Sequence, residues 1–547
     1  MKSVLAIAGI LILASCSSSE DFFTENLGDN NKSVKMTFTA SQENGSATRT
    51  AIGKDDENTK ILWSEDDIIK VTNGTETNDF ALTAGQGTTK ATFEGNMPVS
   101  EGYYAIYPNQ SDVTFSNNTF SGVELKAEQE AVEGSFDPEA AIMVAKSNGT
   151  NLPFKNVVAY FKVTPTFDCS EIVVTAHKST DALAGKFDVA IGDDGTPSIS
   201  ITNGSREVKL TGIITANKDY YILLLPGTFE YGFSVTLKPK DDTTQKYFKQ
   251  KNSSFILNRN DLWNLGKMEG ATEVSESTIP YITFTADKEQ KFSYYNNYTQ
   301  AYQGANEYLE YSVGGGEWKK FDGVISLSAV SFGGGNGNLR LRAKVGQGNY
   351  KESDDGPMFK FGNKTVEVKC TGDIRTLIDY ENYYCANTSN AKFMNFFNSM
   401  TNLKSAPDLP SMELASQCYY AMFKGCTGLT TAPKLPATTL VYGCYREMFS
   451  GCTGLTTAPE LPATKLKPAY HCYRDMFNGC SKLSKVTMLA TDYYTSYCLN
   501  NWLDNAGTSA QSRTLKLASE RVYDGMKKEG YLPEQWQQGQ ATITWNQ

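Results

Sequence analysis

Eleven cysteines and two histidines are the side chains of this 547-residue chain with the greatest capacity for nucleophilic or metal chemistry. His177 and His471 lie far apart in the sequence, so a Ser/His/Asp or Cys/His catalytic set has little to draw on. Cysteine pairs separated by seven residues do not have the spacing of zinc-chelating cysteines. We therefore expect no enzyme, no metal site and no cofactor. A carbohydrate-active β-domain without a recognisable carboxylate pair is the remaining enzymatic alternative.

Short acidic segments offer a second kind of candidate chemistry. Asp-Asp-Gly occurs at 193–195 and 354–356, and Asp-Asp at 241–242, each matching part of a calcium loop. None has the alternating oxygen ligands and the distal Glu of that motif. We expect hairpin turns at these places.

Cys16 differs from the other cysteines because it follows Lys2 and an apolar run over residues 4–13. The run is too short to span a bilayer. The motif LASC that ends at Cys16 is typical of a lipoprotein signal peptide, here 1–16, whose cysteine becomes the lipid-modified N-terminus. An ordinary cleaved signal peptide is the alternative. The acidic start of 17–35 resembles the tether that directs lipoproteins to the outer surface in certain Gram-negative anaerobes, which implies lipid anchoring at the surface of the outer membrane.

The remaining ten cysteines are an even number in an exported chain, which is compatible with disulfides. Seven of them occupy positions on the apolar stripe of an expected helix. Stacked helices stand further apart than the roughly 4.4 to 6.8 Å between Cα atoms that a disulfide requires. We therefore expect buried free thiols that pack as small hydrophobic groups.

A repeated phrase organises the second half of the chain. From about residue 392 to 498 the pattern C-Y-x-x-M-F-x-G-C-T-x-L recurs, and its first cysteines are Cys418, Cys444, Cys472 and Cys498. A fixed period of 26 or 28 residues indicates a solenoid, in which single units cannot bury their apolar faces and must stack.

Each repeat is expected to contain a short helix, an extended strip and a proline-rich return. Cys418, Met422 and Cys426 have the four-residue spacing of one helical face. Leu429 and Leu435 are an even number of residues apart and share one face of the strip.

The phrase resembles the repeat of bacterial surface leucine-rich-repeat proteins. That resemblance implies a short α/β leucine-rich-repeat solenoid over 372–514 and a cell-surface binding role. It identifies no ligand.

If the leucines of the strip point inward, the residues one step out of phase face solvent. The most variable outward column is predicted to bind a partner, and it consists of Asp408, Lys434, Glu460 and Met488. One alternative is that these residues vary because nothing constrains them. Another is that the partner contacts the helical side of the repeats, where Tyr419, Tyr445 and Tyr473 recur.

The first half of the chain alternates short β-rich runs with polar turns. Several motifs there resemble the fimbrillin family of lipoprotein pilus subunits, among them LWSEDDI at 62–68, YYAIYP at 103–108, YYILLLP at 220–226 and RNDLWNLG at 259–266. The resemblance implies tandem transthyretin-like β-sandwiches over 36–155 and 156–268. It also implies proteolytic processing after an arginine, and Arg49 in the polar loop 41–59 matches that position. The alternative is that Arg49 is an ordinary solvated loop residue.

The other segments complete a multidomain, mainly β protein. Residues 269–279 are expected to form a linker, and 280–371 a small β-domain that covers one end of the solenoid. A C-terminal cap over 515–547, which ends with the segment 541–545, should contain a helix near 518–528 and cover the other end.

A net charge of −10 argues against binding nucleic acid. The combined features predict a surface lipoprotein acting as an adhesin or accessory fimbrial component. Its partner would be a host or bacterial surface protein or glycan, or other pilus subunits, and it would touch the membrane only through the lipid. The alternative is a glycan-capturing lipoprotein of a nutrient-uptake system.

Overall fold

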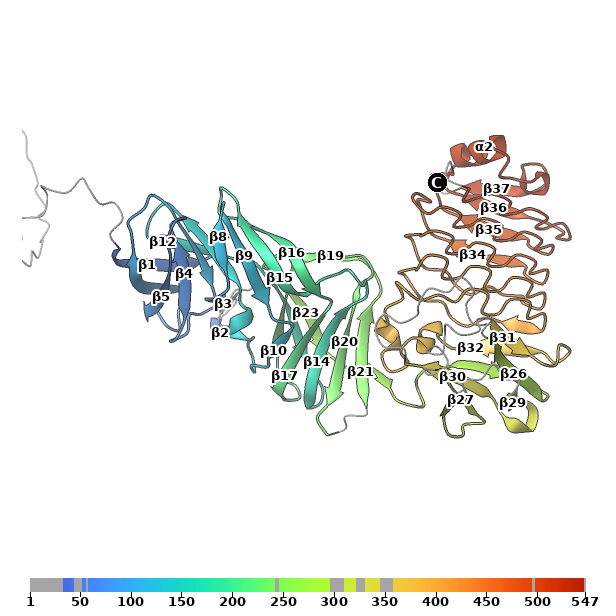
Figure 1. Ribbon diagram of the computed structural model, residues 1–547, viewed down its shortest axis with the longest axis horizontal. Coiled ribbons are helices and arrows are strands. Elements are labelled where there is room, and N and C mark those ends of the chain that lie inside the picture. The colour runs from blue at the N-terminus through green and yellow to red at the C-terminus, as the bar shows by residue number, and fades with distance from the viewer. Residues whose placement is uncertain are drawn as a thin grey trace, which may run out of the picture.

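The computed structural model describes residues 33–43, 52–55, 58–241, 245–295, 309–320, 330–344, 358–493 and 497–545. These residues fold mainly into β-strands, arranged in several separate sheets. Figure 1 shows an elongated β-region, residues 34–274, beside a second body whose coils stack upon one another toward the C-terminus. We call residues 391–517 of that second body the repeat stack.

The first sheet of the β-region closes on itself. Its strands are β1 (Val34–Gln42), β4 (Ile68–Thr72), β5 (Thr77–Ala84), β6 (Lys90–Met97), β7 (Tyr103–Tyr107), β11 (Met143–Ser147) and β12 (Asn151–Asn156). Closure is achieved by β1, which pairs antiparallel with β6 and parallel with β12. The sequence predicts a sandwich here, whereas the observed pairing is a barrel, and closing the sheet removes its free edges.

The remaining strands of the β-region form four more sheets and a short hairpin. They are β2 (Ile52–Asp55), β3 (Asn58–Ile61), β8 (Thr114–Ser116), β9 (Thr119–Leu125), β10 (Glu128–Glu130), β13 (Ala159–Thr164), β14 (Cys169–Ala176), β15 (Ala184–Ile191), β16 (Pro197–Ser205), β17 (Glu207–Ile214), β18 (Tyr220–Leu224), β19 (Gly227–Phe229), β20 (Phe233–Pro239), β21 (Lys246–Lys251), β22 (Phe255–Leu257), β23 (Leu262–Lys267) and β24 (Thr272–Val274). Strands β9 and β10 precede residue 155 in the chain but pair with β15 and β17. One continuous buried cluster joins the barrel to these sheets.

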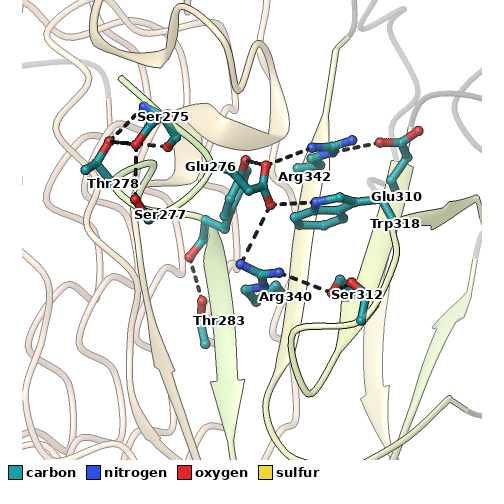
Figure 2. A network of polar contacts seen from close by, with 12 residues as sticks. Ser275, Glu276, Ser277, Thr278, Thr283, Glu310, Ser312, Trp318, Arg340 and Arg342 are labelled. Carbon is teal, nitrogen blue, oxygen red and sulfur yellow. Dashed lines mark hydrogen bonds and ion pairs between the residues drawn. The ribbon is translucent and has the colours of Figure 1, made fainter. Parts of the chain in front are cut away.

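The expected linker is a structured connection. Strand β24 extends the sheet beside β21, and the Oε1 atom of Glu276 accepts a hydrogen bond from Trp318 Nε1 at 2.8 Å. The guanidinium of Arg342 lies over the ring of Trp318, 4.1 Å from its centroid, and both side chains are drawn in Figure 2. The same guanidinium lies 4.2 Å from the centroid of the Tyr380 ring. This network fastens residue 276 to the small sheet that follows.

The small sheets cover one end of the repeat stack. Their strands are β25 (Ile282–Thr285), β26 (Gln290–Tyr295), β27 (Leu309–Val313), β28 (Lys319–Lys320), β29 (Val330–Phe332), β30 (Leu339–Ala343), β31 (Met358–Phe361) and β32 (Val368–Thr371). Strand β32 pairs in parallel with β33 (Leu403–Ser405) of the first coil. The small sheets and the repeat stack share one buried cluster.

Parallel strands continue through the stack as β34 (Thr457–Leu461), β35 (Lys485–Met488), β36 (Thr514–Leu517) and β37 (Thr542–Trp545). Helix α2 (Glu520–Lys528) lies at the far end, as Figure 1 shows, and begins at a Ser519 cap. The prediction of a helix near 518–528 is confirmed. Short 3₁₀ turns occur at Pro138–Ala140, Gly334–Asn336, Ile374–Leu377, Tyr383–Cys385 and Glu534–Trp536.

The cysteine-bearing segment of each repeat is not helical, so the helix expected from its four-residue spacing is wrong. Alternate residues donate backbone hydrogen bonds to the next coil, as Tyr419 N does to Cys444 O at 3.0 Å. The residues between them bond three positions back, as Met422 N does to Tyr419 O at 3.2 Å. Every fourth residue has a left-handed backbone, for example Ala421 (φ 50°) and Gly425 (φ 73°). Side chains point in the same direction every four residues in these turns and about every 3.6 residues in a helix. The predicted stripe of side chains is therefore buried, although the backbone that carries it is not a helix.

Columns of like side chains fill the stack. The rings of Phe397, Phe423, Phe449 and Phe477 lie nearly parallel, with centroids 5.1 to 5.8 Å apart. The ten cysteines of the described residues are free and buried, as the burial prediction requires. The spacing argument against disulfides does not hold, however, because hydrogen-bonded coils lie about 4.8 Å apart.

Candidate functional site

The outward column of the repeat stack is the first candidate site. Asp408, Lys434 and Glu460 are exposed, while the residues that follow them, Leu409 and Leu435, are buried. This alternation is the one expected for an extended strip with a single buried face. The column therefore presents charges of alternating sign that take no part in packing.

Met488 does not belong to this column. It is fully buried and pairs with Leu461, whereas Thr487 stands opposite Glu460. The register shifts between Thr457 and Glu460, so the last step of the column is 27 residues rather than 28. A slip of one residue moves a side chain to the opposite face of a strand, which is why counting repeats from the cysteines misplaced Met488.

A cleft lies where the β-region meets the repeat stack, and two predicted residues line it. Asp408 and Lys434 face this cleft, which has a volume of about 380 Å³ and which we call the joint cleft. The β-region contributes His177, Tyr231 and Asn252 to its lining, and the segment 373–388, which precedes the stack, contributes another part. Glu460 lies outside it, so only the lower part of the predicted column borders a cavity.

The two walls of the joint cleft are held by specific contacts. The carboxylate of Glu413 accepts hydrogen bonds from the backbone N and the Oγ atom of Ser179 at 2.9 and 2.7 Å. The rings of Phe248 and Tyr384 stack with centroids 4.0 Å apart, and Thr236 Oγ1 lies 3.1 Å from Tyr384 Oη. These contacts fix the orientation of the stack against the β-region and leave the cleft preformed.

Most charges in the cleft are already satisfied. Arg375 Nη2 lies 2.8 Å from Asp373 Oδ2, and its Nη1 donates to the carbonyl of Tyr384 at 3.1 Å. Burial lowers the pKa of His177 to about 4, so the ring is neutral at pH 7. Its Nδ1 lies 3.0 Å from the carbonyl of Tyr231. The cleft therefore has little unbalanced charge.

The alternative tyrosine surface is absent from the outside of the stack. Tyr419, Tyr445 and Tyr473 are at most 2% exposed and form a buried column of stacked rings. The prediction placed them on the outside of a helix, but in the four-residue turns they adjoin the cysteine column and face inward.

A different aromatic edge is exposed, and the sequence analysis missed it. Tyr442, Tyr470 and Tyr497 are 44%, 53% and 62% exposed. The ring of His471 meets that of Tyr442 edge-on at 5.7 Å and stacks on that of Tyr497 at 5.6 Å. The equivalent positions of Tyr442 and Tyr470, two residues before a first cysteine, were the available signal.

Two predicted sites cannot be located. Cys16 and Arg49 lie outside the described residues, so their lipidation and processing stay predictions. The Asp-Asp-Gly segment at 193–195 turns between β15 and β16, as expected. Among the described residues, no cluster of His, Cys, Asp or Glu could hold a metal ion. None of the helices in that same part of the chain is long and apolar enough to cross a membrane.

No family model and no curated protein matches this chain. Two solved structures from Bacteroides, both provisionally described as cell adhesion proteins, have a TM-score of 0.29. The one from B. uniformis is 14% identical and covers 44% of this chain and 96% of its own, and the one from B. ovatus is 10% identical and covers 44% and 95%. A major pilin of Streptococcus pyogenes is 9% identical and covers 56% of this chain and 97% of its own, with a TM-score of 0.13. At these similarities, function has to be argued from the chain itself.

Proposed function

We propose that this protein is a lipid-anchored adhesin or accessory fimbrial component on the cell surface, which binds its partner through the repeat stack. The observation that carries the proposal is the outward column of Asp408, Lys434 and Glu460, three exposed charges that each precede a buried leucine of the strip. In a repeat scaffold, such outward positions are the freest to encode recognition.

The geometry of the connection supports a presenting role. The connection through Glu276 and the contacts between Ser179 and Glu413 hold the stack in one orientation relative to the β-region. A binding surface on a rigid support loses less conformational entropy when it meets a partner. An arrangement of this kind suits a head that is displayed at the end of a stem.

The finer assignments in this proposal come from sequence resemblance. They are a β-region of the fimbrillin type, built from transthyretin-like domains, and a repeat stack of the bacterial surface leucine-rich-repeat type. They also include an anchor at Cys16, a location on the outer membrane, and processing after Arg49.

Cells that display the full chain test the proposal in a binding assay against matrix proteins, glycan arrays and pilus subunits. We expect binding to be lost in the charge-reversal pair Lys434→Glu with Glu460→Lys, which keeps the net charge. The matched control reverses Asp524 and Lys527, two exposed residues of α2. Equal binding by both variants would reject the outward column as the binding surface, and membrane retention of Cys16→Ala would reject the anchor.

A further inference from the structure

The joint cleft has the shape and chemistry of a small-ligand site. We propose that it binds one or two neutral sugar units at the end of a glycan. The inference rests on the proposed adhesin function and adds the ligand class and the place where the ligand is held. A volume of about 380 Å³ falls in the lower part of the range for ligand pockets, roughly 300 to 1,000 Å³.

One part of the lining is apolar. Leu409, Pro410 and Pro436 come from the repeat stack, and the nearly buried ring of Tyr231 comes from the β-region. Prolines and tyrosines present C–H and ring surfaces at little conformational cost, because they have few rotatable bonds. Such a surface matches the C–H face of a pyranose ring.

The polar part of the lining has unused hydrogen-bonding capacity. Within the part of the chain that the structure describes, the side chains of Asp408, Lys434 and Asn252 make no hydrogen bond or ion pair, and all three are exposed. A carboxylate accepts, an ammonium donates and an amide does both. Sugar hydroxyls donate and accept as well, so this set can satisfy several of them at once.

Charge favours a neutral ligand over an ionic one. Arg375 is paired with Asp373, and the carboxylate of Glu413 is occupied by Ser179. Asp408 and Lys434, the charged lining residues whose side chains make no hydrogen bond or ion pair among the described residues, have opposite signs. A ligand with a single charge would gain from one of them and lose to the other, whereas hydroxyl groups hydrogen-bond to both.

The ligand would contact both bodies of the protein. Asn252 belongs to the β-region, and Asp408 and Lys434 belong to the stack. A sugar that touches all three adds contacts across a joint that Ser179 and Glu413 already hold. Binding should therefore raise the temperature at which the joint separates, since a ligand stabilises the state that binds it.

Saturation-transfer NMR on the full chain, with a panel of methyl glycosides of neutral hexoses, 6-deoxyhexoses and N-acetylhexosamines, tests the proposal. We expect transfer to at least one glycoside. The double variant Asp408→Ala with Lys434→Ala should weaken its binding at least about tenfold, because each residue supplies a charge-assisted hydrogen bond. The matched control, Asp524→Ala with Lys527→Ala, removes one acid and one lysine from helix α2, outside the cleft, and should stay within about twofold.

Thermal unfolding of both variants separates loss of the site from loss of the fold. No transfer to any glycoside would overturn the proposal, and so would equal weakening by the two variants. Transfer instead to short lysine-containing peptides, abolished by the first variant, would make the cleft a peptide site and also reject the sugar. If displayed chains bind their partner but saturating free glycoside fails to compete, the cleft proposal is wrong while the adhesin function stands. If the displayed chains bind no partner at all, the adhesin function is rejected instead.

Discussion

The β-region and the repeat stack fill their buried cores in different ways. In the barrel each large side chain has its own surroundings, as Trp63 does with the rings of Phe93 and Tyr107 edge-on at 5.1 and 5.4 Å. In the stack Phe449 lies between the equivalent phenylalanines of the neighbouring coils, Phe423 and Phe477. The rings are nearly parallel, and their centroids are 5.7 and 5.8 Å apart. The barrel depends on contacts between distant segments, and the stack depends on contacts between neighbouring coils.

That difference should determine how far the destabilising effect of a mutation spreads through each region. A repeat array is stabilised by each unit and by its interfaces with its neighbours, so a defect acts on adjacent coils first. A closed barrel loses its pairing as a whole, because every strand has two partners. The predictions below test this contrast from its largest expected effect to its smallest.

Removing one ring from the centre of the stack should have the largest effect. We expect Phe449→Ala to lower the free energy of unfolding by about 3 to 5 kcal/mol, since the buried ring leaves a cavity between two coils. Hydrogen exchange should rise in the coils on either side and stay unchanged in the barrel. Phe93→Ala should cost as much but raise exchange throughout the barrel. If hydrogen exchange rose equally across the whole protein in either variant, the contrast between barrel and stack would be wrong.

A methyl group placed between coils should have the next largest effect. A Cβ atom on Gly454 would lie 2.5 Å from the carbonyl oxygen of Thr427 and 3.0 Å from that of Leu429. These are backbone atoms of the preceding coil, in which the N–H groups of Thr427 and Leu429 donate to the carbonyls of Gly425 and Cys426, so Gly454→Ala should cost about 1 to 3 kcal/mol. The control is Gly149→Ala in the hairpin between β11 and β12, where nothing lies within 4 Å. Urea denaturation showing equal stability for both variants would contradict this account of coil spacing.

The thiol columns allow a finer comparison inside the stack. Cys452 Sγ donates to the carbonyl of Phe423 at 3.0 Å, whereas no carbonyl of the described residues accepts from Cys444 Sγ. Cys444→Ser should therefore cost about 1 to 3 kcal/mol, because it buries a poorly satisfied hydroxyl, and Cys452→Ser should cost less. Burial raises the pKa of Cys444 to about 12, so alkylation of the native protein should be slow. Mass spectrometry that finds these cysteines paired would reject their role as packed thiols.

The sequence was informative where spacing alone decides burial. The strip leucines, the cysteine and methionine stripe and the C-terminal helix all follow from periodicity. The turn backbone could not be predicted, because left-handed positions are held by Glu447 and Asp475, residues that fit a helix equally well. The position of Met488 required the register shift after Thr457, which only the paired strands reveal.

The joint cleft was also beyond the sequence. Its lining comes from segments around residues 177–252 and 373–436, which only folding brings together. Lys434 could be predicted to face outward, but the approach of Tyr231 and Asn252 could not. A site formed by two segments that are far apart in the sequence produces no pattern in either segment alone.

The smallest predicted effect concerns the boundary between the two bodies. The pKa of His177 is lowered by burial to about 4, below its ordinary value of 6.5. The unfolded chain therefore binds a proton there first, and this group removes stability as pH falls from about 6.5 to 4. The pKa of Asp181 is raised by burial to about 6, above its ordinary value of 3.8, so this group adds stability as pH falls from about 6 to 3.8. The two effects oppose each other over most of one pH window.

Removing one of these groups should reveal the other. Asp181→Asn should be more stable than the native protein at pH 7, because it discharges a buried carboxyl whose Oδ2 atom has no hydrogen-bond partner among the described residues. The variant should then lose stability more steeply between pH 6.5 and 4, since only the histidine still titrates. His177→Gln should do the reverse and gain stability as the pH falls. Thermal unfolding at closely spaced pH values measures both slopes, and the signal should come from residues near the joint rather than from the barrel or the distant coils. Parallel curves for the native protein and the two variants would mean that neither group titrates in this window, and the joint would then be as insensitive to acid as the two bodies that it connects.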